Sequence, residues 1–243
     1  MLKILYIFVI LLISKSVFSN EVTIINDIPG NGTEIVNHSK VSVHYIGRLE
    51  NNDEFDNSYK RNQTFVFQVG TRQVISGWET GLLGMKEGGK RTIYIPYQLA
   101  YGETGAGDLI PPRSNLIFEI EVIKVIPPQY KIIDSDQLRL AMSDNKFIIL
   151  DIRNLDEINN SGTIPGSINL TAFDKEGNFL PNFFNKYNQL IEPNKKVIFV
   201  SEKGIVSSIL ANGFVEQLNQ KNIYHLKDGI TGLQKIEFKF NKN

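Results

Sequence analysis

Apolar and polar residues alternate along several segments of the first half of the chain. Segment 41–49 has apolar residues at most odd positions and polar residues at most even positions, and segments 65–69 and 116–122 repeat the pattern. A period of two predicts β-strands with one buried face. Residues 75–83 are expected instead to form a short helix closed by Gly84. We therefore predict an α+β domain, in which an antiparallel sheet curves around a short helix.

The alternation of apolar and polar residues ends at Pro127-Pro128. Two consecutive prolines interrupt any strand or helix. We place a domain boundary there. Beyond it, short continuous apolar runs alternate with helical spacing, which predicts an α/β domain with a parallel sheet. The expected strands are 147–150 and 196–200, and the expected helices are 136–142, 179–191 and one that carries Leu210, Phe214 and Leu218.

The N-terminus carries an uninterrupted apolar run over residues 4–13, preceded by Lys3. The run is shorter than the roughly 17 to 25 residues that cross a bilayer, and it is typical of a signal-peptide core. Val17 and Ser19 supply the small residues that precede a cleavage site. We predict a signal peptide over 1–19, with an uncleaved anchor as the alternative because Phe18 extends the apolar character. The protein would then be exported to the periplasm or secreted, with no membrane contact after cleavage.

With that signal removed, the chain divides into a first domain over 20–127 and a second domain over 128–243.

The composition, 42% hydrophobic and 21% charged, is that of globular domains. Lysine plus arginine and aspartate plus glutamate both number 26, so no net charge favours binding to a nucleic acid. The chain has no cysteine, which excludes disulfides, zinc-thiolate sites and thiolate nucleophiles. With only three histidines, we expect no metal and no cofactor.

The first half resembles the FKBP family of peptidyl-prolyl isomerases over residues 22–126, in the segments VSVHYIGRLENNDEFD, FVFQVGTRQVISGWETGLLGMKEGGKRTIYIP, LAYGETG and LIPPRSNLIFEIEVIKV. The resemblance implies a five- or six-stranded antiparallel sheet curved around a short helix, with an aromatic cavity between them. It also implies partners: proline-containing peptides, unfolded or folding proteins, and macrolide inhibitors of the FKBP type.

The chemistry of such an enzyme requires no proton transfer and no covalent intermediate. Rotation about an X-Pro bond is slow because it breaks amide resonance, a barrier of about 20 kcal/mol. A catalyst needs a dry cavity that fits proline and a few donors that favour the twisted amide. Aromatic rings are large and rigid enough to form that cavity, and a tyrosine adds a polar tip at its rim.

The resemblance also implies which residues of this chain are catalytic and which bind the substrate. Asp56, Tyr101 and the backbone N–H of Ile75 are the expected catalytic groups, and Trp78 is the floor under the prolyl ring. The other expected substrate-binding residues are Tyr45, Phe55, Arg61, Phe65, Val74, Leu109, Ile110 and Phe118. Any single aromatic residue of this set could equally be part of the core. The sequence departs from the family at Ala106, where well-known members often carry histidine.

The second half resembles the rhodanese family over residues 129–240, in the segments 148–153, 162–170, 196–207 and 224–230. Active members carry a cysteine where this chain has Ser201, and a persulfide requires a sulfur atom. Val206 replaces the usual basic residue of the loop, and Glu202 adds a negative charge. We therefore predict a domain without sulfurtransferase activity. Ser201 as a hydrolytic nucleophile would have only His225 as a base, with no identifiable acid to orient it.

The leading hypothesis is an exported peptidyl-prolyl isomerase that acts in protein folding, with an inactive rhodanese-like domain that binds or positions clients. The alternative is a non-catalytic chaperone or interaction protein that uses the proline cavity as a binding groove. A sulfurtransferase ranks third.

Overall fold

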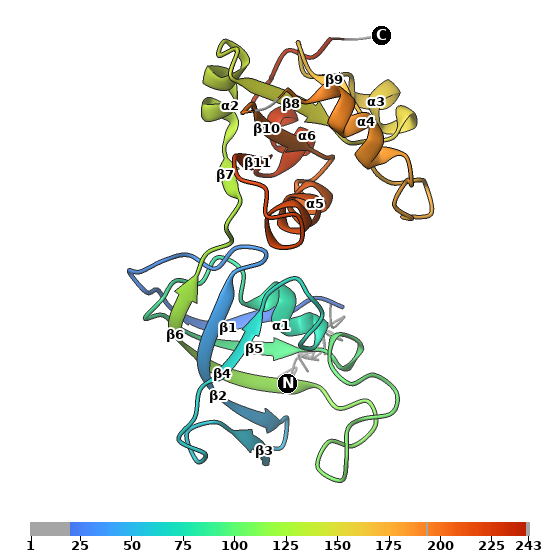
Figure 1. Cartoon of the computed structure of the whole chain (residues 1–243). Helices are drawn as coiled ribbons and strands as arrows, with labels where there is room; N and C mark the ends of the chain where they lie inside the picture. Colours follow the sequence, from blue (N-terminus) through green and yellow to red (C-terminus); the bar gives the residue numbers. More distant parts are fainter. Residues whose placement is uncertain (1–19, 193, 242–243) are drawn as a thin grey trace, which may run out of the picture.

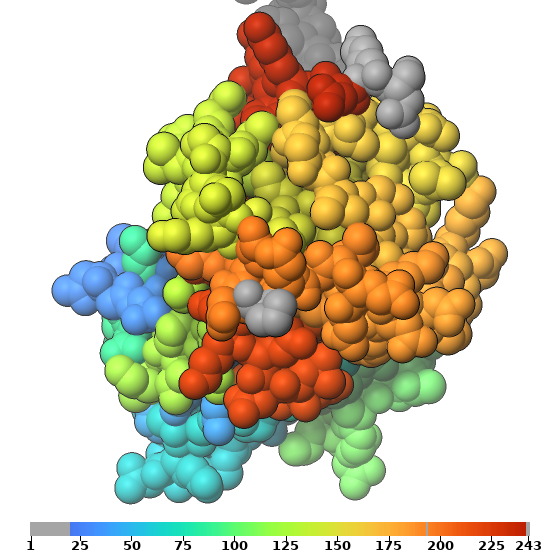
Figure 2. All heavy atoms as spheres, turned by 45° about the horizontal axis from the view of Figure 1, so that its top comes forward, coloured from blue at the N-terminus to red at the C-terminus, as the bar shows by residue number. Residues whose placement is uncertain are grey.

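The structure is a computed structural model that describes residues 20–192 and 194–241, so the signal peptide expected over 1–19 lies outside the described residues. Two separate sheets are arranged end to end along the molecule (Figure 1). Figure 2 shows the second domain, in yellow-green to red, in front, and atoms of the first domain, in blue, cyan and green, project beyond it. Within the described residues, no helix is long and apolar enough to cross a membrane.

The first sheet has six strands and is antiparallel at every pairing, which confirms the predicted α+β class. Its order is β1-β5-β6-β2-β3, and β4 pairs with β2. The longest pairing joins β2 and β6, from Lys40 opposite Ile126 to Leu49 opposite Leu116. The strands are β1 (Thr23–Ile28), β2 (Lys40–Leu49), β3 (Glu54–Asn57), β4 (Phe65–Gln68), β5 (Lys90–Ile95) and β6 (Leu116–Ile126).

A single short helix, α1 (Ser76–Gly81), packs its buried residues against this sheet. It is shorter than the predicted span of 75–83, since the chain leaves the helix at Leu82 and then turns at Gly84, whose φ is +78°. Gly77 brings the helix close to β5, because a Cβ atom there would lie 2.3 Å from Cγ2 of Ile95. A 3-10 turn, Tyr97–Leu99, follows β5.

Replacement of Gly77 by alanine tests this close approach. We expect Gly77→Ala to lower the free energy of unfolding by about 1–3 kcal/mol, because the added methyl group overpacks a filled core. The matched control is Gly213→Ala, in helix α5 (Ile205–Glu216), where a Cβ atom meets nothing within 4 Å. That variant should be more stable by up to about 1 kcal/mol. Urea unfolding followed by circular dichroism measures both, and equal stability of the two variants would contradict the account.

The second sheet has five strands, all parallel, in the order β7-β11-β10-β8-β9. This confirms the predicted α/β class, and β10 spans the residues expected for it. The strands are β7 (Lys131–Ile133), β8 (Phe147–Asp151), β9 (Ile168–Asn169), β10 (Lys196–Val200) and β11 (Ile223–Leu226). The helices are α2 (Ser135–Met142), α3 (Leu155–Ser161), α4 (Phe183–Leu190), α5 and α6 (Gly229–Gln234).

Helices cover both faces of this sheet. The central strand, β10, therefore has apolar side chains on both faces. In β10, Val197 and Phe199 pack with α4 and α5. Ile198 and Val200 face the other way and pack with α2 and α6. The continuous apolar run at 196–200 follows from this double burial.

In the second domain, two predicted helix boundaries are wrong by two residues or more. Helix α4 begins at Phe183 and not at Phe179, because Phe179 pairs with Phe173 in a tight loop that Asp174 stabilises. Helix α5 ends at Glu216, which leaves Leu218 outside it and 46% exposed. There the backbone N–H of Gln220 donates to the carbonyl of Phe214 and the chain turns away.

The two sheets are joined by residues 127–130, and Tyr130 is buried between them. Its hydroxyl donates to the carbonyl of Asn37, at 2.8 Å, and lies 3.1 Å from Nδ1 of His38. Its ring packs edge-on against His225 of β11, with centroids 5.3 Å apart. We call Tyr130, His38 and His225 the interdomain joint, since they connect the loop before β2 with the second sheet.

The interdomain joint should be sensitive to acid. Burial lowers the pKa of His38 to about 4, and burial together with the charge of His38 lowers the pKa of His225 to about 4. Unfolded histidines titrate near pH 6.5, so between about pH 6.5 and 4 the unfolded chain binds more protons than the folded one. The free energy of unfolding therefore falls as the pH is lowered through this window.

The variant His38→Asn isolates the contribution of one ring, because asparagine tolerates the positive φ of 65° at this position. Thermal unfolding at pH 7 and pH 5 should show a smaller decrease in melting temperature for the variant than for the wild type. The same decrease in both proteins would show that His38 does not titrate in this way.

Candidate active site

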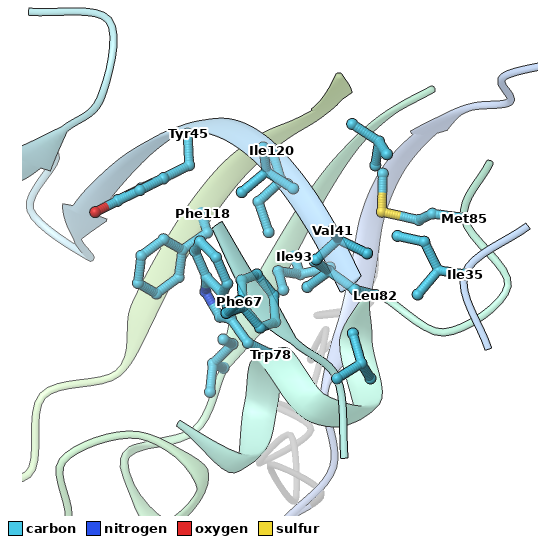
Figure 3. Packing of buried hydrophobic residues seen from close by; sticks show 14 of the residues in the cluster. Ile35, Val41, Tyr45, Phe67, Trp78, Leu82, Met85, Ile93, Phe118 and Ile120 are labelled. Carbon is cyan, nitrogen blue, oxygen red and sulfur yellow. The ribbon is translucent and has the colours of Figure 1, made fainter. Parts of the chain in front are cut away.

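The first domain contains a cluster of aromatic rings centred on Trp78. The indole packs edge-on against Tyr45 and Phe118, with centroids 5.0 Å and 5.2 Å away. It also contacts Phe67 at 5.6 Å and Phe65 at 6.1 Å. Figure 3 shows Tyr45, Phe67, Trp78 and Phe118 grouped at one end of the core. Edge-to-face contacts of this kind fix the orientation of each ring.

Different elements of the fold supply these rings. Tyr45 is on β2 and Phe118 on β6, and the alternation of each strand turns them toward α1, which carries Trp78. Phe55, on β3, packs edge-on against Phe118 at 5.6 Å. Gly47 leaves space for this contact, because a Cβ atom there would lie 2.6 Å from the ring of Phe55. The sheet register thus brings together rings that are more than 70 residues apart in the sequence.

A hydrogen-bonded network of Tyr45, Asp56 and Arg61 borders the cluster. The hydroxyl of Tyr45 and Nη1 of Arg61 each donate to the carboxylate of Asp56, and Nη2 of Arg61 donates to the Tyr45 oxygen at 3.0 Å. Burial raises the pKa of Asp56, but the donors from Tyr45 and Arg61 and the charge of Arg61 outweigh it, and the pKa is lowered. Burial and the bond to Asp56 raise the pKa of Tyr45 to about 12. The carboxylate is thus ionised at neutral pH and held in one orientation.

The remaining residues expected at the site differ in how far they are exposed to solvent. Tyr101 is 39% exposed, and burial and the charge of Asp56 raise the pKa of its phenol. Ile75 precedes α1, and its backbone N–H forms no hydrogen bond within the described chain. Val74 and Ile75 pack at the edge of the core. Ile110 is buried, whereas Leu109 is 64% exposed and is not part of the core cluster.

Two features of the site were not predicted from the sequence. Phe67 is 2% exposed and packs beneath Trp78, and its position in the alternating segment 65–69 was the only signal for it. The indole Nε1 of Trp78 is buried and has no hydrogen-bond partner among the described residues. A buried donor without an acceptor is costly, so it marks a point where a ligand acceptor would be stabilised.

Among the described residues, no group of three or more histidine and carboxylate side chains could hold a metal ion.

Removal of the Arg61 guanidinium should raise the pKa of Asp56, because a charge-assisted hydrogen bond and a positive charge are both lost. We expect Arg61→Ala to shift the carboxyl titration of Asp56 to higher pH, measured by NMR of the side-chain carbon. Lys60→Ala is the matched control, since Lys60 pairs with Glu54 at 2.6 Å and not with Asp56. An unchanged titration in Arg61→Ala would show that the ion pair does not hold this carboxylate.

Ser201, in the loop after β10 of the second domain, is not a free nucleophile. Ser201 is 3% exposed, and its hydroxyl accepts from the backbone N–H of Ser207 at 3.0 Å and donates to the hydroxyl of Ser207 at 3.1 Å. His225 lies 3.4 Å from the Ser207 hydroxyl and forms no bond with Ser201. Among the described residues, no carboxylate forms a hydrogen bond with His225. The arrangement is that of a structural hydrogen-bond chain and lacks the base-to-nucleophile contact of a hydrolase.

These observations define two kinds of domain. The first is an antiparallel α+β fold with an aromatic cluster and an ionised, oriented carboxylate at its edge. The second is an α/β scaffold whose catalytic position holds a hydrogen-bonded serine.

Residues 32–123 match the family model described as FKBP-type peptidyl-prolyl cis-trans isomerase, and residues 134–236 match the model of the rhodanese-like domain. The FK506-binding protein of Neisseria meningitidis serogroup A is 50% identical over 96 residues, which are 40% of this chain and 88% of that protein. The human peptidyl-prolyl cis-trans isomerase FKBP2 is 54% identical over 83 residues, which are 34% of this chain and 58% of that protein. The crystal structure of AtFKBP13 matches at 40% identity with a TM-score of 0.40, over 43% of this chain and 91% of that chain.

The chain belongs to the FKBP family of peptidyl-prolyl cis-trans isomerases, as its identity to the Neisseria protein over most of that protein's length shows. It carries in addition a rhodanese-like domain without the catalytic cysteine, since the chain contains no cysteine.

Proposed function

We propose that this enzyme accelerates X-Pro isomerisation in exported polypeptides at the aromatic cluster of its first domain, and that its rhodanese-like domain binds or positions those clients. The observation that carries the proposal is the set of rings around Trp78, bordered by the Tyr45–Asp56–Arg61 network. Its partners are then proline-containing peptides and unfolded proteins, and macrolides of the FKBP type are its inhibitors.

The rings supply an apolar surface on which the prolyl ring loses water. In the planar ground state, resonance makes the amide strongly polar, whereas the twisted transition state has lost that conjugation. An apolar environment therefore stabilises the twisted amide relative to the planar one, and this difference lowers the barrier. Trp78 would lie under the prolyl ring, with Tyr45 and Phe118 at its sides.

Polar groups at the edge of the cluster would orient the substrate. The backbone N–H of Ile75 is available to donate to a substrate carbonyl, and the exposed hydroxyl of Tyr101 can donate to the substrate backbone. The ionised carboxylate of Asp56 lies close enough to Tyr101 to affect its pKa, so both act on the same end of the site. Arg61 keeps that carboxylate in place.

The domain limits and the export of the protein belong to the same proposal. We place the signal peptide at 1–19, the isomerase domain at 20–127 and the rhodanese-like domain at 128–243, with the mature protein in the periplasm or outside the cell. The apolar run at 4–13 and the small residues before position 20 support export.

A tetrapeptide isomerisation assay tests the assignment of catalysis. We expect Asp56→Ala and Tyr101→Phe each to lower kcat/KM by at least about tenfold, which corresponds to about 1.4 kcal/mol of transition-state stabilisation. The matched controls are Asp53→Ala, in the turn before β3, and Tyr59→Phe, whose hydroxyl donates to Glu121. Wild-type activity no higher than that of Asp56→Ala would instead favour a non-catalytic chaperone.

A further inference from the structure

Residues 69–75 connect β4 with α1 and end at Ile75, whose backbone N–H is one of the expected catalytic groups. Both ends of this β4–α1 connection are fixed. The backbone N–H of Val69 donates to the carbonyl of Ser39 at 3.0 Å, and the carbonyl of Ile75 accepts from the N–H of Trp78 at 2.9 Å. The conformation of the residues between these ends therefore decides how the N–H of Ile75 is oriented.

The turn at the start of the connection has an unusual backbone conformation. Gly70 and Arg72 have φ values of +80° and +59°. Glycine adopts such values freely, whereas the Cβ atom of an arginine makes them costly. The conformation of Arg72 therefore has to be stabilised by an interaction with another part of the protein.

Glu79, on α1, supplies that interaction. Its carboxylate accepts from the backbone N–H of Gly70 through Oε2, and from the N–H of Arg72 at 2.7 Å through Oε1. Hydrogen bonds to a charged acceptor are about twice as strong as bonds between neutral groups. Within the described chain, the backbone N–H groups of residues 70–75 have no other acceptor. The whole connection thus depends on one side chain.

Glu79 also relates the connection to the aromatic cluster. It is the neighbour of Trp78 on α1, and the indole of Trp78 is fixed by the rings that pack around it. One short helix therefore carries both the indole expected under the prolyl ring and the carboxylate that holds the turn before Ile75. The orientation of the Ile75 N–H relative to that indole depends on the two bonds of Glu79.

We propose that Glu79 is a positioning residue of the isomerase site, which keeps the β4–α1 connection in the conformation that presents the N–H of Ile75 to a substrate carbonyl. The inference rests on the proposed isomerase function and deepens it. Without the carboxylate, Arg72 relaxes toward a negative φ, and only a fraction of the molecules presents the donor. The apparent affinity for the substrate falls by that fraction, so KM rises while kcat at saturation does not change.

The kinetic test uses the full-length chain and a tetrapeptide substrate. We expect Glu79→Gln to raise KM about fivefold with kcat unchanged, because glutamine has one carbonyl oxygen and its amide group cannot accept the second N–H. The matched control is Glu87→Gln, since Glu87 also accepts a backbone N–H, that of Val125 at 2.9 Å, and is not part of the β4–α1 connection. It should leave KM and kcat unchanged. A wild-type KM in Glu79→Gln, or a loss confined to kcat, would overturn the proposal.

A second substitution separates positioning from a general loss of stability. Asparagine adopts a positive φ more readily than arginine. Adding Arg72→Asn to the Glu79→Gln variant should therefore return KM part of the way to the wild-type value. A KM that shows no recovery would contradict the proposal, because the backbone at Arg72 would then not be what the carboxylate holds.

Amide exchange and binding, both measured by NMR, keep the inference separate from the catalytic assignment. The amide protons of Gly70 and Arg72 should exchange with water faster in Glu79→Gln than in Glu87→Gln, because their acceptor is altered. Titration with a tetrapeptide that contains one X-Pro bond should give a Kd about fivefold higher for Glu79→Gln than for the control. Both differences are expected even when the wild type shows no isomerisation. Equal Kd values, or equal exchange in the two variants, would overturn the inference.

Discussion

The packing of Trp78 is the constraint on which the proposed isomerase site depends. Helix α1 carries Trp78, and the helix lies this close to the sheet because Gly77 lets it approach Ile95 on β5. Four other rings then pack on Trp78, from β2, β4 and β6. A shift of the helix by the thickness of one methyl group would move Trp78 relative to the strands that carry the other four rings. The geometry of the aromatic cluster therefore depends on how closely α1 packs on the sheet.

The two domains of the chain use their polar groups in different ways. In the first domain, Tyr45 and Arg61 hold an ionised Asp56 at the edge of the aromatic cluster, where it affects the neighbouring Tyr101. In the second, the donors of Arg153 and the hydroxyl of Ser201 are all consumed within the protein. The rhodanese-like domain thus keeps the fold of its family, but the donors at the position of the missing cysteine are bonded within the protein.

The sequence predicted most of this architecture because much of it follows from local patterns. Alternation along 41–49 and 116–122 indicated strands with one buried face, and the apolar run at 196–200 indicated a strand buried on both. The sequence could not indicate β1, whose residues are all exposed, since its place depends on backbone pairing with β5. Similarly, the interdomain joint depends on contacts between residues more than 90 positions apart, and no local pattern reports such contacts. The pairing of Arg153 with Glu202 has the same origin, because the two residues are 49 positions apart.

The single tryptophan of the chain allows one direct test of the central claim, that prolyl substrates bind over Trp78 in the first domain. A ¹⁵N-labelled sample has one indole N–H resonance, and it belongs to a buried donor without a partner among the described residues. Titration with a tetrapeptide that contains one X-Pro bond should shift this resonance, whereas the same peptide with alanine in place of proline should leave it unchanged. An indole resonance that does not move at peptide concentrations that saturate the isomerase would contradict the account.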